Sequence, residues 1–89
     1  MDLRSYLKSL DQKAREQFAM RVATTVGHLN NIAYGGRTAS AALARQLEIE
    51  TNASVRRWDL RPTDWHRIWP ELIATEGAPA VPAESEAQA

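Results

Sequence analysis

The sequence predicts a small all-α domain of five helices. Apolar residues recur at spacings of three and four, which places them on one face of a helix. No segment shows the alternation of β-branched and polar residues that is typical of a half-buried strand. The chain has 89 residues, enough for one domain. We expect this domain at residues 1–73 and a disordered tail, rich in Ala, Pro and Glu, at residues 74–89.

The first two helices are expected at residues 1–10 and 12–22. Their apolar stripes are formed by Leu3, Leu7 and Leu10 in the first helix and by Phe18, Ala19 and Val22 in the second. Ser9 or Asp11 is expected to cap the second helix, because a short polar side chain can accept a hydrogen bond from the free N–H groups there.

A tight turn at residues 23–25 is expected to join the second helix to a third helix at Thr25–Tyr34. Thr24 or Thr25 can cap this third helix through its hydroxyl group. The apolar stripe of the third helix contains Leu29, Ile32 and Ala33. The Gly35–Gly36 pair is expected to end it, because glycine readily adopts the positive φ found at helix C-termini.

The fourth helix is expected at residues 41–50, with Ser40 as its cap. Its apolar side contains Leu43, Ala44 and Leu47. A short fifth helix at residues 55–60, capped by Ser54, should stop before Pro62, since the residue before a proline disfavours the helical conformation.

The exposed face of the third helix suits the edges of DNA bases. It carries no carboxylate, and its residues outside the apolar stripe are Val26, Gly27, His28, Asn30, Asn31 and Tyr34. An asparagine amide can form hydrogen bonds to N6 and N7 of adenine at the same time. Two asparagines in the middle of a helix lower the stability of that helix, and no packing role within the domain explains them. Val26 can pack on a thymine methyl group. Gly27 indicates a close approach, either of DNA or of a neighbouring side chain.

The segment from Ala19 to Gly35 reads A-x-x-V-A-T-T-x-x-x-L-x-x-I-x-x-G and resembles the helix-turn-helix of phage repressor and Cro proteins. Together with DLRSYL, ASAALARQLE and WDLRPTDW, it makes residues 2–70 resemble the YdaS family of Cro-like prophage regulators. The turn residue Ala23 departs from the pattern, which usually has a left-handed glycine there. Alanine in that conformation costs about 1 kcal/mol.

The resemblance implies a fold like that of lambda repressor and Cro, and a sequence-specific transcriptional repressor that binds double-stranded operator DNA through its third helix. The residues expected to contact bases are Val26, Gly27, His28, Asn30 and Asn31. The residues expected to contact phosphates are Arg15, Thr25, Tyr34 and Arg37. The resemblance also implies an alternative, a DNA-binding antitoxin that neutralises a toxin protein.

The three tryptophans lie together near the end of the predicted domain, and two interpretations stay open. The segment either folds back to complete the core, which is favoured for Trp58, or it exposes a patch that pairs two copies of the chain. Because small repressors bind palindromic sites as pairs, we expect a homodimer. Its predicted interface contains Trp58, Trp65, Ile68 and Trp69. If the helix-turn-helix is only a scaffold, the same segment would bind another protein and the chain would not bind DNA.

The net charge of zero conceals an asymmetry. Residues 1–67 hold all 11 basic residues and 7 of the 11 acidic ones, whereas residues 68–89 hold four acidic residues and no basic one. A basic domain is compatible with a polyanionic partner.

Without cysteine, and with His28 and His66 as isolated histidines, we expect no metal or cofactor. No catalytic motif is present, so we expect no enzyme. No signal peptide or membrane-spanning run is present either, and we expect a cytoplasmic protein.

Overall fold

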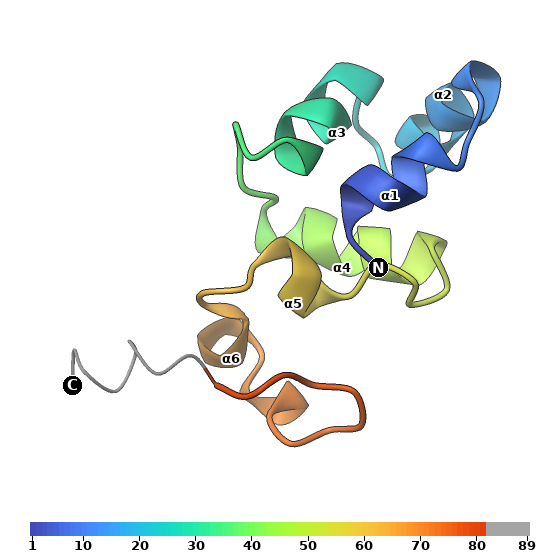
Figure 1. Ribbon diagram of the computed structural model, residues 1–89. Coiled ribbons are helices and arrows are strands. Elements are labelled where there is room, and N and C mark those ends of the chain that lie inside the picture. Colours follow the sequence, from blue (N-terminus) through green and yellow to red (C-terminus); the bar gives the residue numbers. More distant parts are fainter. Residues whose placement is uncertain (82–89) are drawn as a thin grey trace.

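The computed structural model describes residues 1–81, and this part of the chain contains helices and no strand. The predicted all-α fold class is therefore confirmed. In order, the elements are α1 (Leu3–Lys8), α2 (Gln12–Arg21), α3 (Val26–Ala33), α4 (Ala41–Glu50), α5 (Arg57–Leu60), α6 (Trp65–Ile68) and a 3₁₀ helix, η1 (Pro70–Leu72). Figure 1 shows α1, α2 and α3 grouped at one end, α4 across the middle, and α5 and α6 beyond it.

The first four helices each begin at a short polar side chain that accepts a backbone hydrogen bond. The capping residues are Asp2 for α1, Asp11 for α2, Thr25 for α3 and Ser40 for α4. Of the alternatives that the sequence leaves open, Asp11 rather than Ser9 caps α2, and Thr25 rather than Thr24 caps α3. Such a cap stabilises a helix by about 1 kcal/mol.

Helices α2, α3 and α4 end in the same hydrogen-bonded motif. Two residues after the last helical residue, φ is positive: 59° at Ala23, 86° at Gly35 and 52° at Asn52. The N–H groups of that residue and the next one donate to carbonyls of the final helical turn. The left-handed conformation predicted for Ala23 is therefore confirmed, and it sets the direction in which α3 leaves α2.

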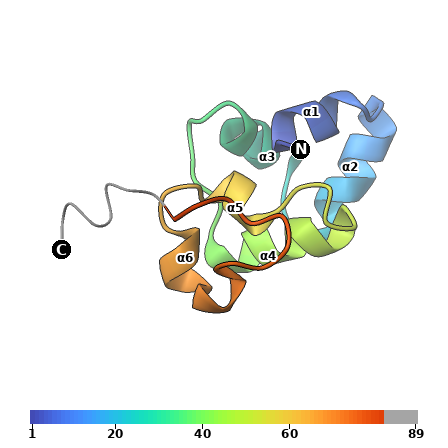
Figure 2. The same ribbon diagram turned by 60° about the horizontal axis from the view of Figure 1, so that its bottom comes forward.

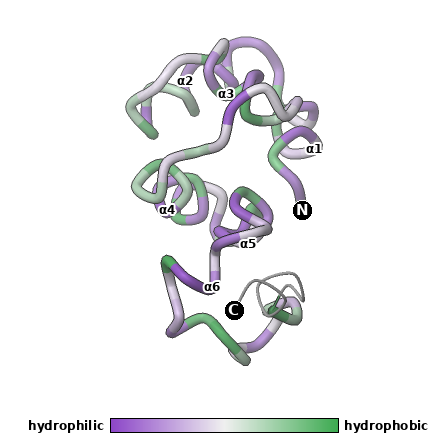
Figure 3. The backbone as a smooth tube through the Cα atoms, turned by 90° about the vertical axis from the view of Figure 1, so that its left-hand side faces the viewer, coloured by the Kyte–Doolittle hydropathy of each residue, from purple (hydrophilic) through white to green (hydrophobic). Residues whose placement is uncertain are grey.

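The main core lies between α1, α2, α3 and α4 and is built from the predicted apolar stripes. Phe18, Leu29 and Leu47 are fully buried in it. Helix α3 packs against both α1 and α2, and α4 packs against α5, as Figure 2 shows from below. Figure 3 shows hydrophobic and hydrophilic residues alternating along α4, as expected of a helix with one buried side.

A second, smaller core is formed by Trp58, Trp65 and Leu72, with Trp69 and Ala78 packed against it. The rings of Trp58 and Trp65 meet edge to face, with 5.7 Å between their centroids. This core requires two corrections to the predicted helices. Helix α6 is not among the five predicted helices. The last predicted helix starts at Arg57 rather than at residue 55, and its N-cap is Arg56 rather than the predicted Ser54, because the Arg56 N–H donates to the Asp59 carboxylate at 2.9 Å.

The packed structure extends past residue 74, where the predicted tail begins. The Ala78 N–H donates to the Thr75 carbonyl at 3.0 Å, and Ala78 packs against the second core. Gly77 lies beside the ring of Trp58 and adopts a φ of 83°, which glycine tolerates without strain. Residues 82–89 of the predicted disordered tail lie outside the described residues. Within residues 1–81, no helix is long and apolar enough to cross a membrane.

Candidate nucleic-acid interface

Helix α3 presents an uncharged face to solvent. Successive residues are turned by about 100° around a helix, so Gly27 and Asn31 lie opposite the fully buried Leu29, at the centre of the exposed face. Asn30 is also exposed but is rotated toward α1. His28 is half-buried on the other edge. The five predicted base-contacting residues therefore differ in what they can offer to a ligand.

Val26 is half-buried and packs against the main core, so only part of its side chain is free for a thymine methyl group. Gly27 is exposed, and a Cβ built on it would have no neighbouring atom within 4 Å. Within residues 1–81, the interpretation that a neighbouring side chain requires glycine here is therefore wrong. The close approach of DNA at Gly27 stays a prediction.

The four predicted phosphate-contacting residues surround α3. The Thr25 hydroxyl accepts the His28 N–H at 3.1 Å and keeps its own proton for another acceptor, at the helix end that attracts anions. Tyr34 is 62% exposed at the other end of α3, and the Arg4 guanidinium lies 4.7 Å from its ring centroid. Arg37 is exposed after the Gly35–Gly36 turn.

Arg15 is less free than predicted. Its Nε donates to the carbonyl of Leu7 at 2.9 Å, and its side chain is half-buried. This bond connects α2 to the last turn of α1. The terminal nitrogens of the guanidinium have no hydrogen-bond or carboxylate partner within residues 1–81, so they can still meet a phosphate.

The basic side chains fall into two groups according to whether they have carboxylate partners. The paired residues are Arg21 with Glu50, Arg45, Arg56 and Arg57 with Glu48, and Arg61 with Asp64. Two hydrogen bonds from the Arg61 guanidinium, one to each oxygen of Asp64, lower the pKa of Asp64 below its usual value. Within residues 1–81, the basic side chains without a carboxylate partner are Arg4, Lys8, Lys13, Arg15, Arg37 and Arg67. Five of these six lie on α1, on α2 or just after α3.

Two acidic residues at the starts of α1 and α2 bind backbone N–H groups rather than arginines. Asp2 and Asp11 cap α1 and α2, where each accepts a backbone N–H at 2.8 Å. The hydrogen bond from Ser5 lowers the pKa of Asp2. Between Glu16 and Glu48 the sequence contains no acidic residue. The exposed face of α3 therefore carries no negative charge, whereas Asp2 and Asp59 line a second pocket beside Ile32, Ala33 and Gly35. An uncharged face bordered by unpaired cations favours an anionic partner.

A surface notch of about 370 Å³ lies between α1, α2 and α3, and we call it the basic notch. Its polar lining residues are Arg4, Lys8, Arg15, Asn30 and Tyr34. Leu7 and Ala33 complete the lining, to which residues 1–81 contribute no carboxylate. The sequence did not single out Arg4 or Lys8, because only the packing of α1 against α3 brings these side chains to the exposed face.

The structure divides the predicted dimer interface. Trp58 and Trp65 are 8% and 1% exposed, so these side chains complete a core within one chain and offer little surface to a second copy. Ile68 and Trp69 are half-buried, and Arg57 lies 5.1 Å from the Trp69 ring centroid. Of the four predicted residues, Ile68 and Trp69 are the ones with surface left for a dimer.

Helix α2, the turn at Ala23 and α3 thus form a helix-turn-helix whose second helix presents an uncharged face between unpaired cations. Over 60 residues, the chain is 33% identical to the prophage transcriptional regulatory protein of Escherichia coli (strain K12). This alignment covers 67% of the present chain and 91% of that protein. The chain belongs to the family of this prophage regulatory protein. No protein-family model matches it.

Proposed function

We propose that this protein is a sequence-specific, DNA-binding transcriptional repressor that inserts α3 into the major groove of an operator. Membership of the prophage regulator's family supports a role in transcription. The narrower assignment, a Cro-like repressor of the YdaS type, rests on the resemblance of the segment from Ala19 to Gly35.

The observation that carries the proposal is the charge pattern around α3. Its exposed face has no acidic residue, and unpaired cations border it. A paired arginine must give up its carboxylate before it can bind a phosphate, whereas an unpaired one need not. The group without carboxylate partners is therefore the one that can neutralise a DNA backbone at least cost, and neutralised phosphates supply most of the affinity for DNA of any sequence.

The residues around α3 then divide between two tasks. Asn31, at the centre of the exposed face, donates and accepts hydrogen bonds at an adenine edge. The missing side chain at Gly27 lets the backbone come close to the bases, and Val26 and His28 flank this centre. Arg15, Thr25, Tyr34 and Arg37 contact phosphates on either side.

A selection of bound duplexes from a random pool tests the proposal. The wild type should enrich one sequence, and Asn31→Ala should weaken binding to that sequence by about 1–3 kcal/mol while it leaves binding to random duplex nearly unchanged. Gln46→Ala is the matched control, because Gln46 is an exposed amide on α4. Full discrimination by Asn31→Ala would remove Asn31 from the reading face.

Gly27→Ala separates folding from binding. Because the added methyl group meets no atom of residues 1–81, it should raise the free energy of unfolding, by up to about 1 kcal/mol. The same methyl group should weaken binding to the selected duplex by about 1 kcal/mol or more, since it keeps the helix away from the bases. A variant that is more stable and binds equally well would show that DNA does not approach at Gly27.

Arg37→Ala should weaken binding to selected and random duplexes by the same factor and reduce the slope of log K against log salt by about 0.9. Arg37 is the suitable residue for this measurement, because Arg15→Ala would also remove the hydrogen bond to Leu7.

The operator is proposed to bind a homodimer paired through Ile68 and Trp69. The toxin-binding alternative stays a prediction, and a pool that yields no enriched duplex would favour an interaction module that does not bind DNA.

A further inference from the structure

We propose that the basic notch holds a phosphate group, borne by the DNA backbone beside the groove that α3 enters. The inference rests on the proposed function and extends it. It gives Arg4 and Lys8 a role in binding, and it moves Asn30 from a base contact to a phosphate contact.

The basic notch carries a concentrated positive charge. Arg4, Lys8 and Arg15 bring three positive charges to one cavity of about 370 Å³, and the lining holds no carboxylate. None of the three forms an ion pair within residues 1–81. Like charges gathered in this way repel one another, and an anion between them would relieve the repulsion. A phosphate suits this site better than a carboxylate, because it has several strong acceptor oxygens for donors that come from three directions.

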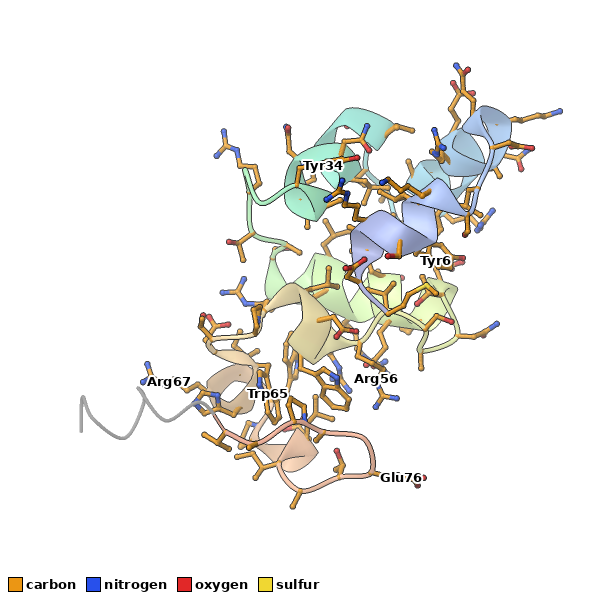
Figure 4. The ribbon with its side chains drawn as sticks, in the orientation of Figure 1. Tyr6, Tyr34, Arg56, Trp65, Arg67 and Glu76 are labelled. Atoms are coloured by element: carbon orange, nitrogen blue, oxygen red, sulfur yellow. The ribbon has the colours of Figure 1, made fainter. Side chains whose placement is uncertain are left out.

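The donors are also held in place before any ligand binds. Arg15 is fixed by the bond from its Nε to the Leu7 carbonyl, which leaves its terminal nitrogens free. Arg4 stacks on the ring of Tyr34, at 4.7 Å from the centroid. Figure 4 shows Tyr34 on the side of α3 that faces α1. Two arginines positioned in this way lose little side-chain entropy when a phosphate arrives, so affinity is gained.

The position of the notch identifies the source of the phosphate. An α-helix with its side chains is about 10–12 Å wide, and the major groove is about 12 Å wide. Residues at the centre of the inserted face therefore meet bases, and residues at its edges meet the backbone. Gly27 and Asn31 lie at the centre of the exposed face of α3, whereas Asn30 lies at its edge toward α1 and lines the notch together with Tyr34, one turn further along the chain. The notch opens at that edge.

The test compares single charge removals on two duplexes, the selected sequence and a random one. Lys8 is exposed and has no hydrogen-bond or ion-pair partner among residues 1–81, so Lys8→Gln changes charge without disturbing packing. Lys8→Gln should weaken binding to both duplexes by the same factor, about fivefold, and reduce the salt slope by less than about 0.9, because Arg4 and Arg15 still contact the phosphate. Arg4→Gln should do the same. Arg67→Gln is the matched control: it removes an unpaired cation on α6, far from the notch (Figure 4), and should change neither quantity.

Asn30→Ala distinguishes a phosphate contact from a base contact. It should weaken binding to both duplexes alike, so that the ratio of the two affinities stays at the wild-type value, in contrast to Asn31→Ala. A fall in that ratio would return Asn30 to the bases and overturn this part of the inference.

Neutral methylphosphonates, placed one at a time in the selected duplex, locate the phosphate. At the position held by the notch, the substitution should weaken the wild type more than it weakens Lys8→Gln, in which only Arg4 and Arg15 still contact that phosphate. If Lys8→Gln and Arg4→Gln bind both duplexes as well as the wild type does, the notch holds no DNA phosphate, although the proposed function stands.

If the wild type itself binds neither duplex, the proposed function fails. In that case a titration with inorganic pyrophosphate, followed by the NMR signals of the Tyr34 ring, still tests the notch. Shifts that disappear in Lys8→Gln would indicate a free phosphate compound rather than DNA as the ligand, and would overturn the assignment to the DNA backbone.

Discussion

At the scale of single residues, Ala23 shows how backbone conformation serves the interface. It adopts φ of 59° in the turn between α2 and α3, and its side chain is exposed. The Cβ therefore contributes strain of about 1 kcal/mol and little packing. The motif survives because Phe18, Ala19 and Leu29 bury the two helices against each other on the other side of the turn.

Ala23→Gly should raise the free energy of unfolding by about 0.5–1 kcal/mol, because glycine adopts the positive φ without strain. Urea unfolding measures this change. Ala42→Gly is the control, since Ala42 is an exposed alanine in the helical conformation of α4, and this substitution should lower stability by up to about 1 kcal/mol. A loss of stability in Ala23→Gly would show that the left-handed turn is not strained.

At the scale of helices, α4 is tied to the segment around α5 through one buried carboxylate. Glu48 lies on α4 with 8% of its side chain exposed. Its oxygens lie 3.3 Å from Arg45, 3.3 Å from Arg56 and 3.1 Å from Arg57. Arg56 and Arg57 also cover the rings of Trp58 and Trp69. A single glutamate thus orients the cations that join the main core to the tryptophan core.

Glu48→Gln should lower the free energy of unfolding by about 2–3 kcal/mol, because it leaves partly buried guanidinium groups without their counter-charge. The estimate is below the value for a fully buried pair, since Arg45 and Arg56 reach solvent. Glu50→Gln breaks the more exposed pair with Arg21, at 3.2 Å, and should cost no more than about 1 kcal/mol. Equal losses in the two variants would contradict this role of Glu48.

The same scale shows what the sequence could predict. The four longer helices carry both caps and apolar stripes, so the sequence predicts their bounds to within about two residues. For α4 the predicted range 41–50 and the observed range Ala41–Glu50 agree. A single turn such as α6 has too few residues for a period to appear. The sequence could not assign Arg4 and Lys8 to the notch, because their place there depends on the packing of α1 against α3. Glu48 likewise gave no signal, since its arginine partners are set by the turn after α4.

At the scale of the whole molecule, two ends have different chemistry. The end formed by α1, α2 and α3 carries unpaired cations and the uncharged face of α3. The other end carries most of the paired arginines, the unpaired Arg67 and the tryptophan core. Because the proposed DNA-binding face and the half-buried Ile68 and Trp69 belong to different ends, a second copy can pair there without covering α3.

Sedimentation at tens of micromolar tests the proposed dimer. The wild type should sediment as a dimer, and Ile68→Ala should shift it toward the monomer. Ile68 suits this test better than Trp69, which also packs against both cores, so that its loss would disturb the fold. Ile49→Ala removes an exposed isoleucine from α4 and serves as the control. A monomeric wild type that binds a palindromic site without cooperativity would remove the dimer.

The salt dependence of wild-type binding to the selected and to a random duplex tests most directly whether this chain reads DNA sequence. In each protomer Arg4, Lys8 and Arg15 should neutralise one phosphate and Arg37 another, so log K should fall with log salt at a slope of about −2 per protomer for the selected duplex. At physiological salt the selected duplex should bind at least about 10³-fold more tightly than the random one. Equal affinity for the two duplexes, or affinity that does not change between about 50 and 200 mM salt, would contradict a sequence-specific DNA-binding function.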